Sequence, residues 1–154
     1  MIKLKEGDKA PAINAKDENG NVISLDQFKG KKKILYFYPK DNTPGCTANA
    51  CNFRDNFKEL SDMGFQIIGV SSQGEESHQK FIAKYSLPFP LIADTDLKVH
   101  HDYGVWGKKK FMGREYDGTH RTTFIIDEKN VISHIITKVK TKDATEQIKE
   151  VLGK

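Results

Sequence analysis

The sequence predicts an α/β fold in which a mixed central β-sheet carries helices on both faces, within a single domain spanning residues 1–154. Three observations predict it. Short apolar runs at 33–38 and 65–71 alternate with helical patterns in the first half of the chain. Two further strand-like runs, joined by a turn, precede a helical segment at the end. A length of 154 residues and a hydrophobic content of 37% suffice for one buried core.

The first elements are a small hairpin and a buried strand. Residues 13–16 and 22–25 flank the turn signal Asp17–Gly20, which predicts an N-terminal β-hairpin. The run 33–38 (KILYFY) is nearly all apolar and is followed by Pro39. This pattern is typical of a central strand that is covered on both faces.

A helix follows this strand and has a clear start. Thr43 is suited to the N-cap position, and Pro44 to the first helical position. Apolar residues then recur at spacings of three and four, at Ala50, Phe53, Phe57 and Leu60. We expect this helix to end at Gly64.

The remaining elements complete the sheet. In chain order we expect a strand at 65–71, a helix at 75–85 with Phe81, Ile82 and Tyr85 inward, a strand at 91–93, a helix at 97–103, a glycine-punctuated loop at 104–118, strands at 122–127 and 131–138 around a turn at 128–130, and a helix at 144–152. This order fits a thioredoxin-like fold.

Charge and hydropathy exclude two classes of partner. The chain has 25 Lys+Arg against 21 Asp+Glu, and its densest lysine runs, 31–33 and 108–110, lack the interleaved arginines and aromatics of a nucleic-acid surface. No apolar stretch approaches the roughly 20 residues that span a bilayer, and the first residues are charged, with no apolar signal core. We expect a soluble cytoplasmic protein that binds neither nucleic acid nor membrane.

The chain has two cysteines, Cys46 and Cys51, and their spacing indicates chemistry. A structural disulfide between them would close a tiny loop and remove little unfolded-state entropy. A structural zinc site needs four ligands, and the five histidines form no metal-spaced pair with the cysteines. We therefore expect no metal or cofactor. A thioredoxin-type dithiol reductase uses a two-residue spacer, whereas this chain has four residues between its cysteines.

Cys46 falls in the first turn of the predicted helix. Free backbone N–H groups and the positive end of the helix dipole meet there and favour an anion such as a thiolate. Because the inward-facing apolar residues of the helix follow it at helical spacing, Cys46 points towards the sheet. We expect Tyr38, Pro39 and Thr43 to shape a small substrate pocket around it.

Cys51 cannot bond to Cys46 while the helix stays wound. Five helical residues turn about 140° and rise about 7.5 Å, which places the Cα atoms roughly 8 to 9 Å apart. A disulfide tolerates at most about 7 Å. Either the two cysteines never pair, or the first helical turns unwind when they do.

The segments that carry the chemistry resemble a known family. Pro39, Thr43 and Cys46 reproduce the P-x-x-x-T-x-x-C signature of peroxiredoxins, and the likeness extends through GDKAPA, FYPKDNTPGCT, CNFRDNF, GVSSQ, KYSLPFPLIAD, YGVWGKK and RTTFIID. Together these segments are similar to the bacterioferritin-comigratory, or Q-type, peroxiredoxins, in which a second cysteine follows five residues after the first. Asn49 departs from the acidic or glutamine residue expected of that family.

The resemblance implies a function and roles for residues. Cys46 would be the peroxidatic cysteine and Cys51 the resolving one, Arg121 would lie beside the thiolate, and Thr43 would hold the peroxide. The protein would be an antioxidant monomer that reduces hydrogen peroxide and organic hydroperoxides, with thioredoxin or a similar dithiol as reductant.

Other interpretations remain open at this point. A helix cap would account for Thr43 without any catalytic role. Arg121 could equally be a charged residue on the surface of a strand. If Cys51 stays buried, an outside thiol would resolve Cys46. A non-enzymatic redox sensor that uses the cysteine pair, or a disulfide reductase, would also use these residues.

Overall fold

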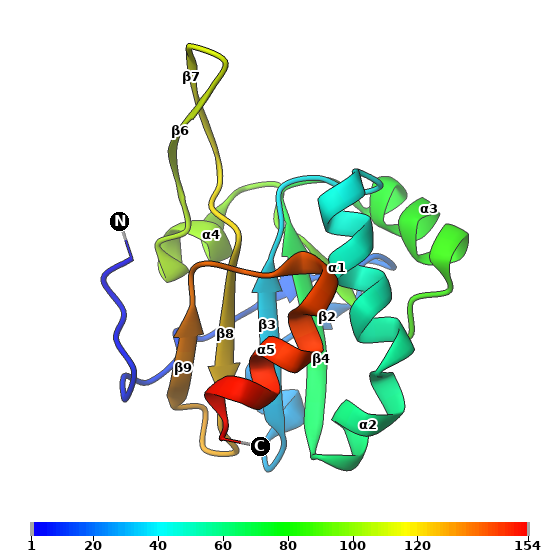
Figure 1. Ribbon diagram of the computed structural model, residues 1–154, viewed down its shortest axis with the longest axis vertical. Helices are drawn as coiled ribbons and strands as arrows, with labels where there is room; N and C mark the ends of the chain where they lie inside the picture. The colour runs from blue at the N-terminus through cyan, green and yellow to red at the C-terminus, as the bar shows by residue number, and fades with distance from the viewer. Residues whose placement is uncertain (1, 154) are drawn as a thin grey trace.

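A five-stranded mixed sheet forms the centre of the fold (Figure 1). The computed structural model describes residues 2–153. The strand order is β5–β4–β3–β8–β9, where β3 (Lys32–Phe37), β4 (Phe65–Ser71) and β5 (Leu91–Ala93) are parallel, and β8 (Thr122–Ile126) and β9 (Ile132–Ile136) are antiparallel to their neighbours. The predicted mixed sheet is confirmed.

Helices cover both faces of this sheet, as predicted. One face carries α1 (Pro44–Asp55), α2 (Phe57–Asp62), α3 (Glu75–Tyr85) and α5 (Ala144–Val151), the last preceded by the 3-10 turn η2 (Thr141–Asp143). The other face carries α4 (Lys98–Tyr103), the 3-10 turn η1 (Leu25–Phe28) and the hairpin of β1 (Ala15–Lys16) and β2 (Val22–Ile23). No helix among residues 2–153 combines the length and the apolar character needed to cross a membrane.

The buried apolar residues form two cores, one on each face of the sheet, and strand β3 contributes side chains to both. Side chains alternate between the faces of a strand. Ile34 and Tyr36 therefore join the core under α1, while Leu35 and Phe37 join the core under α4. The chain leaves β3 at Phe37 and enters α1 at Pro44, which places the helix start at the end of the central strand.

The predicted helix from Thr43 to Gly64 is wrong in its continuity, since the structure has two helices with a break at Asn56. The backbone of Asn56 departs from helical values (φ −108°, ψ 16°), and its side-chain amide donates to the Asn52 carbonyl at 2.8 Å. Asparagine side chains compete in this way with the backbone for carbonyl groups.

The predicted loop at 104–118 is also wrong. It contains the hairpin of β6 (Trp106–Phe111) and β7 (Arg114–Thr119), which projects from the body of the molecule (Figure 1). Met112 and Gly113 form its turn with φ of 51° and 80°, the backbone of a two-residue hairpin turn. The turn sets the strand register although the strands lack an alternating apolar pattern.

The other predicted elements agree more closely with the structure. The N-terminal hairpin is shorter than predicted, because Leu25 begins η1 instead of ending a strand. The remaining strands and helices lie within two residues of their predicted bounds. On α3, Phe81 is buried, and Ile82 and Tyr85 are partly buried against the core.

Candidate active site

Cys46 and Arg121 meet at the carboxyl end of β3. Cys46 is 1% exposed in the first turn of α1, and Nη2 of Arg121 donates to its Sγ at 3.3 Å. Arg121 immediately precedes β8, whose first residue, Thr122, pairs with Phe37 at the end of β3. The antiparallel register therefore brings a residue 75 positions away to the helix start.

The helix start leaves backbone donors free of side-chain caps. Thr43 occupies the N-cap position, as predicted, but its hydroxyl donates to the Lys40 carbonyl at 2.9 Å and caps no backbone N–H. Pro44 has no N–H, and Thr47 N–H already donates to the Thr43 carbonyl. The N–H groups of Gly45 and Cys46 therefore form the positive end of the helix.

Gly45 allows the guanidinium to pack against the first turn. A Cβ at this position would lie 3.3 Å from Nη2 of Arg121, closer than most side-chain contacts. The arginine thus lies directly against both the helix start and the sulfur. This arrangement concentrates hydrogen-bond donors and positive charge around one buried thiol.

Further polar groups are buried around Cys46. The Tyr36 hydroxyl, both polar atoms of the Asn49 amide and Nη1 of Arg121 are buried without a hydrogen-bond partner among the described protein groups. Burial, followed by the charges of Cys46 and Asp41, raises the pKa of Tyr36 well above its usual range. Tyr36 therefore stays neutral and keeps its proton as a donor.

Cys51 lies on the same helix and is half-buried. Both cysteines are free thiols in the structure, as the helical spacing predicts for a wound α1. The next residue, Asn52, donates to the carbonyl of Lys142 and accepts two hydrogen bonds from Thr145, which ties this end of α1 to the C-terminal segment.

Tyr38 and Pro39 lie just before this site. Tyr38 is fully buried in the same core as Cys46, and its hydroxyl donates to Oδ1 of Asp41 at 2.6 Å. Pro39 is half-buried at the end of the strand. Sequence reasoning missed Asp41 and its buried partner His78, although Asp41 lies within the motif that singled out Cys46.

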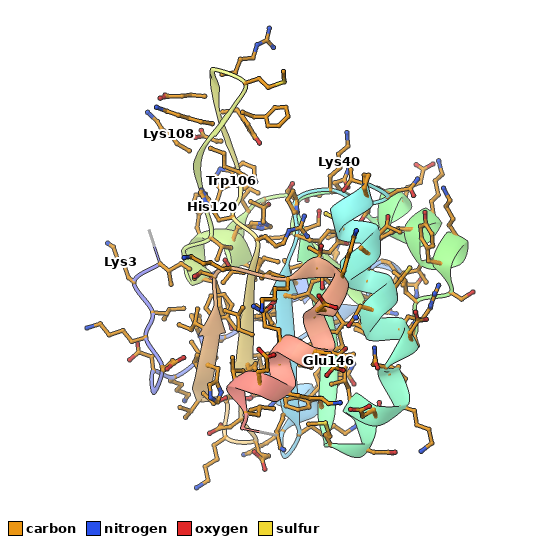
Figure 2. All side chains as sticks on the ribbon, in the orientation of Figure 1. Lys3, Lys40, Trp106, Lys108, His120 and Glu146 are labelled. Atoms are coloured by element: carbon orange, nitrogen blue, oxygen red, sulfur yellow. The ribbon has the colours of Figure 1, made fainter. Side chains whose placement is uncertain are left out.

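Arg121 also lines a hollow. The hollow has a volume of about 490 Å³ and is lined by Ile2, Lys109, His120, Arg121, Thr122 and Thr137. His120 lies at the base of the projecting hairpin (Figure 2). Burial, and next the positive charge of Arg121, lowers the pKa of Lys109.

Residues 2–153 contain no cluster of three or more His, Cys, Asp or Glu side chains arranged to hold a metal ion.

Comparison with known proteins identifies the family. The profile of the AhpC/TSA family matches residues 6–135. The putative peroxiredoxin bcp of Coxiella burnetii is 46% identical over 153 residues, covering 99% of each chain. The chain belongs to the AhpC/TSA family of peroxiredoxins. As a peroxiredoxin it is a thiol peroxidase, an oxidoreductase that reduces peroxides.

Other relatives agree with this assignment. Peroxiredoxin Bcp of Escherichia coli K12 is 43% identical over 143 residues, covering 93% of this chain and 92% of that protein. Among solved structures, a mutant of Xanthomonas campestris peroxiredoxin Q superimposes with a TM-score of 0.85 at 28% identity, covering 99% of this peroxiredoxin and 97% of that chain. The predicted thioredoxin-like fold and the predicted Q-type, or Bcp, subfamily are confirmed.

Proposed function

We propose that Cys46 is the peroxidatic cysteine and that Arg121 and Thr43 act beside it in reducing hydrogen peroxide and organic hydroperoxides. The observation that carries this assignment is the contact between Nη2 of Arg121 and Sγ of Cys46 at 3.3 Å. If Arg121 were only a surface charge, its guanidinium would be expected in solvent and not in contact with a buried sulfur at a helix start. The contact therefore favours the catalytic interpretation of Arg121.

In the proposed first step the Cys46 thiolate attacks the nearer oxygen of the peroxide. An S–O bond forms as the O–O bond breaks, so that Cys46 becomes a sulfenic acid, and the departing oxygen takes a proton to leave as water or an alcohol. The guanidinium and the N–H groups of Gly45 and Cys46 donate where negative charge develops on the oxygens.

The role of Thr43 follows from its hydrogen bond. Because the hydroxyl proton is donated to Lys40, a lone pair of Oγ1 is left to accept the O–H of the peroxide. Thr43 thereby orients the substrate, and the donors of Arg121 and the helix start stabilise the transition state. Tyr38 and Pro39 shape the site from the strand side.

Magnitudes show that activation of the thiol alone is insufficient. A cysteine of ordinary acidity is about 3% ionised at pH 7, so complete ionisation gains at most about thirtyfold in rate. A single well-placed donor contributes about 10²- to 10³-fold. The larger part of the rate enhancement should come from the donors around the breaking O–O bond.

In the proposed second step Cys51 attacks the Cys46 sulfenic acid. An S–S bond forms, and the sulfenic oxygen leaves as water. Because the wound helix holds the two cysteines too far apart, the first turns of α1 must unwind. An external dithiol then reduces the disulfide and restores both thiols.

We further propose a thioredoxin-like protein as this dithiol, and a cytoplasmic monomer as the working form, without nucleic-acid or membrane partners. A structurally similar protein, the bacterioferritin comigratory protein of Xanthomonas campestris, is described as having alkyl peroxide reduction activity. That protein is 27% identical to this chain. Its activity supports organic hydroperoxides as substrates here.

The test is steady-state peroxide consumption with and without thioredoxin and its reductase, comparing wild type with Cys46→Ser and Cys51→Ser. We expect Cys46→Ser to abolish consumption, and Cys51→Ser to remove thioredoxin-supported turnover while keeping one oxidation per chain. Full turnover by Cys46→Ser would refute the assignment of the nucleophile. A single stoichiometric oxidation in the wild type would favour a sensor, and insulin reduction would favour a disulfide reductase.

A further inference from the structure

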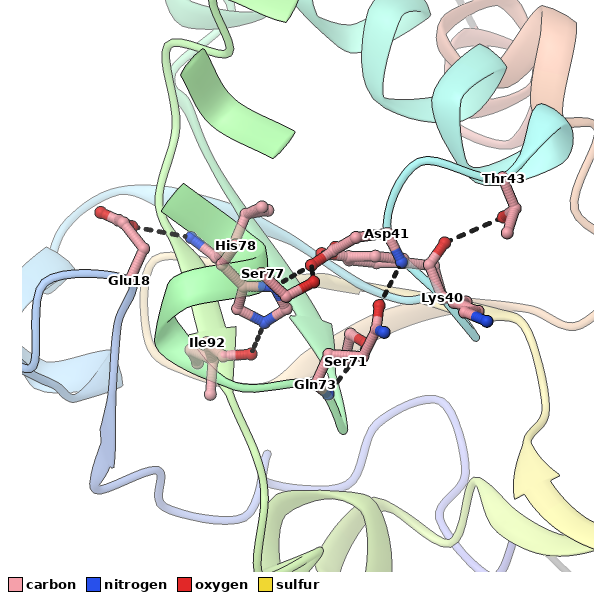
Figure 3. Close-up of polar contacts among 11 residues, drawn as sticks. Glu18, Lys40, Asp41, Thr43, Ser71, Gln73, Ser77, His78 and Ile92 are labelled. Atoms are coloured by element: carbon pink, nitrogen blue, oxygen red, sulfur yellow. Dashed lines mark hydrogen bonds and ion pairs between the residues drawn. The ribbon is translucent and has the colours of Figure 1, made fainter. Parts of the chain in front are cut away.

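Both ring nitrogens of His78 have buried hydrogen-bond partners. His78 is fully buried on α3, with Nδ1 2.6 Å from Oδ2 of Asp41 and Nε2 2.9 Å from the carbonyl oxygen of Ile92 on β5 (Figure 3). A backbone carbonyl can only accept a hydrogen bond, so Nε2 carries a proton. If the Asp41 carboxyl is ionised it can only accept as well, and Nδ1 must then also carry a proton.

Two hydroxyl donors besides His78 surround the Asp41 carboxyl and favour its ionised form. The hydroxyl of Tyr38 donates to Oδ1 at 2.6 Å. The hydroxyl of Ser77 donates to Oδ2 at 2.8 Å (Figure 3). Burial by itself raises the pKa of Asp41, but the hydrogen bonds and charge of His78, with those from Tyr38 and Ser77, lower it overall. With the carboxyl ionised and both ring nitrogens protonated, Asp41 and His78 form a buried ion pair of carboxylate and imidazolium, with Nδ1 2.6 Å from Oδ2.

This ion pair fastens the segment that leads into the active site. Asp41 lies between Pro39 and Thr43, and its backbone N–H donates to the side-chain oxygen of Gln73. The adjacent carbonyl of Lys40 accepts the hydroxyl of Thr43. Fixing Asp41 therefore fixes the carbonyl that orients the Thr43 hydroxyl, just before α1 begins.

Asn42 adds a second attachment to the same helix. Its side-chain oxygen accepts hydrogen bonds from Tyr85 at 3.0 Å and from Lys84 at 3.3 Å, both on α3. These groups are exposed, whereas the pair of Asp41 and His78 is buried. The buried pair is the stronger restraint, because hydrogen bonds between charged groups strengthen when water is excluded.

We propose that His78, as a buried imidazolium, is a positioning residue for the peroxide step, acting through Asp41 on the Lys40 carbonyl and the Thr43 hydroxyl. The proposal rests on the proposed roles of Cys46 and Thr43. His78 touches neither substrate nor sulfur; it sets the geometry of the groups that do. A displacement of about 1 Å at such groups costs on the order of a hundredfold in rate.

The first experiment separates the two half-reactions. Stopped-flow fluorescence of the reduced full-length protein measures Cys46 oxidation by hydrogen peroxide, and a second mixing step measures reduction of the disulfide by dithiothreitol. We expect His78→Gln to slow the peroxide step by about ten- to a hundredfold and to leave reduction by dithiothreitol within about twofold. A residue that only stabilised the fold would leave the peroxide rate of the folded protein unchanged.

Two further variants complete the comparison. Ser77→Ala removes one hydrogen bond to Asp41 and should slow the peroxide step less than His78→Gln. His101→Gln, on the exposed side of α4, is the matched control and should react at the wild-type rate. A folded His78→Gln protein with the wild-type peroxide rate would overturn the proposal.

The second experiment needs no variant. In ¹⁵N NMR spectra of the reduced wild type near pH 7.5, we expect both ring nitrogens of His78 to show the shifts of a protonated imidazolium. A neutral ring would overturn the proposal even if His78→Gln failed to fold. Peroxide turnover by Cys46→Ser would refute the proposed function instead and would leave this NMR result unchanged, so the two failures are distinguishable.

Discussion

Oδ1 of Asn52 accepts hydrogen bonds from both the backbone N–H and the hydroxyl of Thr145, at 2.9 and 2.6 Å. This contact joins α1 to the first turn of α5, one residue beyond Cys51. On the other side of the cysteines, Asp41 and Asn42 hold the chain to α3. The segment that carries both cysteines is therefore fastened at each end.

Removing the Asn52 contact should destabilise the reduced protein. Asn52→Ala leaves the backbone N–H of Thr145 without its acceptor, which should lower the free energy of unfolding by about 1 to 3 kcal/mol. Urea unfolding followed by circular dichroism measures this change. Asn14→Ala, at an exposed position, is the control, and equal stabilities for the two variants would contradict the expectation.

Oxidation should unwind α1 between these two attachments. One equivalent of hydrogen peroxide should produce a disulfide between Cys46 and Cys51 together with a loss of helical circular dichroism, because a wound helix cannot bring the two sulfur atoms together. Cys51→Ser treated in the same way should keep its helical signal. A disulfide detected by mass spectrometry without any loss of helix would disprove the unwinding.

Replacement of Arg121 should affect the peroxide step strongly. Arg121→Lys keeps the charge but loses the planar fork that reaches Sγ, so we expect the rate constant for Cys46 oxidation to fall by about 10²- to 10³-fold. Arg114→Lys, at the tip of the projecting hairpin, should leave it unchanged. Stopped-flow measurement with hydrogen peroxide decides between these outcomes, and equal rates for the two variants would exclude Arg121 from the site.

Thr43 offers a test that separates chemistry from capping. Thr43→Val should slow peroxide consumption by about ten- to a hundredfold, because the hydroxyl that orients the substrate is lost. The stability should change by less than the roughly 1 kcal/mol of a lost helix cap, since the hydroxyl caps no backbone N–H. Thr43→Ser should restore most of the rate. If Thr43→Val greatly lowered the free energy of unfolding but left the rate of peroxide consumption unchanged, Thr43 would be a helix cap and not a catalytic residue.

A second buried carboxylate governs stability in acid. Asp94 accepts hydrogen bonds from the ring and backbone of His100 and from the Val99 N–H. Burial raises its pKa, but these hydrogen bonds lower it overall. A folded-state pKa below the unfolded value stabilises the fold above about pH 4, and this contribution is lost as the pH falls through the folded pKa.

Asp94→Asn should therefore lower the free energy of unfolding by about 1.5 to 3 kcal/mol at pH 7. The difference from wild type should shrink as the pH falls below about 4. Unfolding curves at a series of pH values measure both effects. Asp117→Asn, which is exposed on β7, should follow the wild-type curve. If Asp94→Asn lowered the free energy of unfolding equally at every pH, the lowered pKa of Asp94 would not be the source of the stabilisation.

Strong local patterns made most of the fold predictable. The strands at 33–38 and 65–71 are short apolar runs bounded by Pro39 and Gly64, and both agree with the structure to within a residue. The hairpin of β6 and β7 was missed because its lysine-rich strands lack alternation, and its turn at Gly113 was interpreted as part of a loop. The break at Asn56 was missed because an asparagine side chain gives only a weak signal within an apolar helical pattern.

The candidate site was predictable where its residues are close in sequence. Thr43, Pro44 and Cys46 lie within one helical turn, so their spacing alone places the cysteine at the helix start. The placement of Arg121 depends on the register between β3 and β8, which no local pattern specifies, and only the resemblance to a family predicted it. The pairing of Asp41 with His78 joins residues 37 positions apart and left no signal that sequence reasoning could use.

The projecting hairpin of β6 and β7 has a practical consequence for engineering. Met112 is 87% exposed at its tip, and each of its two strands pairs with the other along its length. An affinity tag or a fluorescent label inserted between Met112 and Gly113 would therefore disturb neither buried core. Such an insertion would allow the protein to be immobilised on a sensor surface for measurements of peroxide reduction.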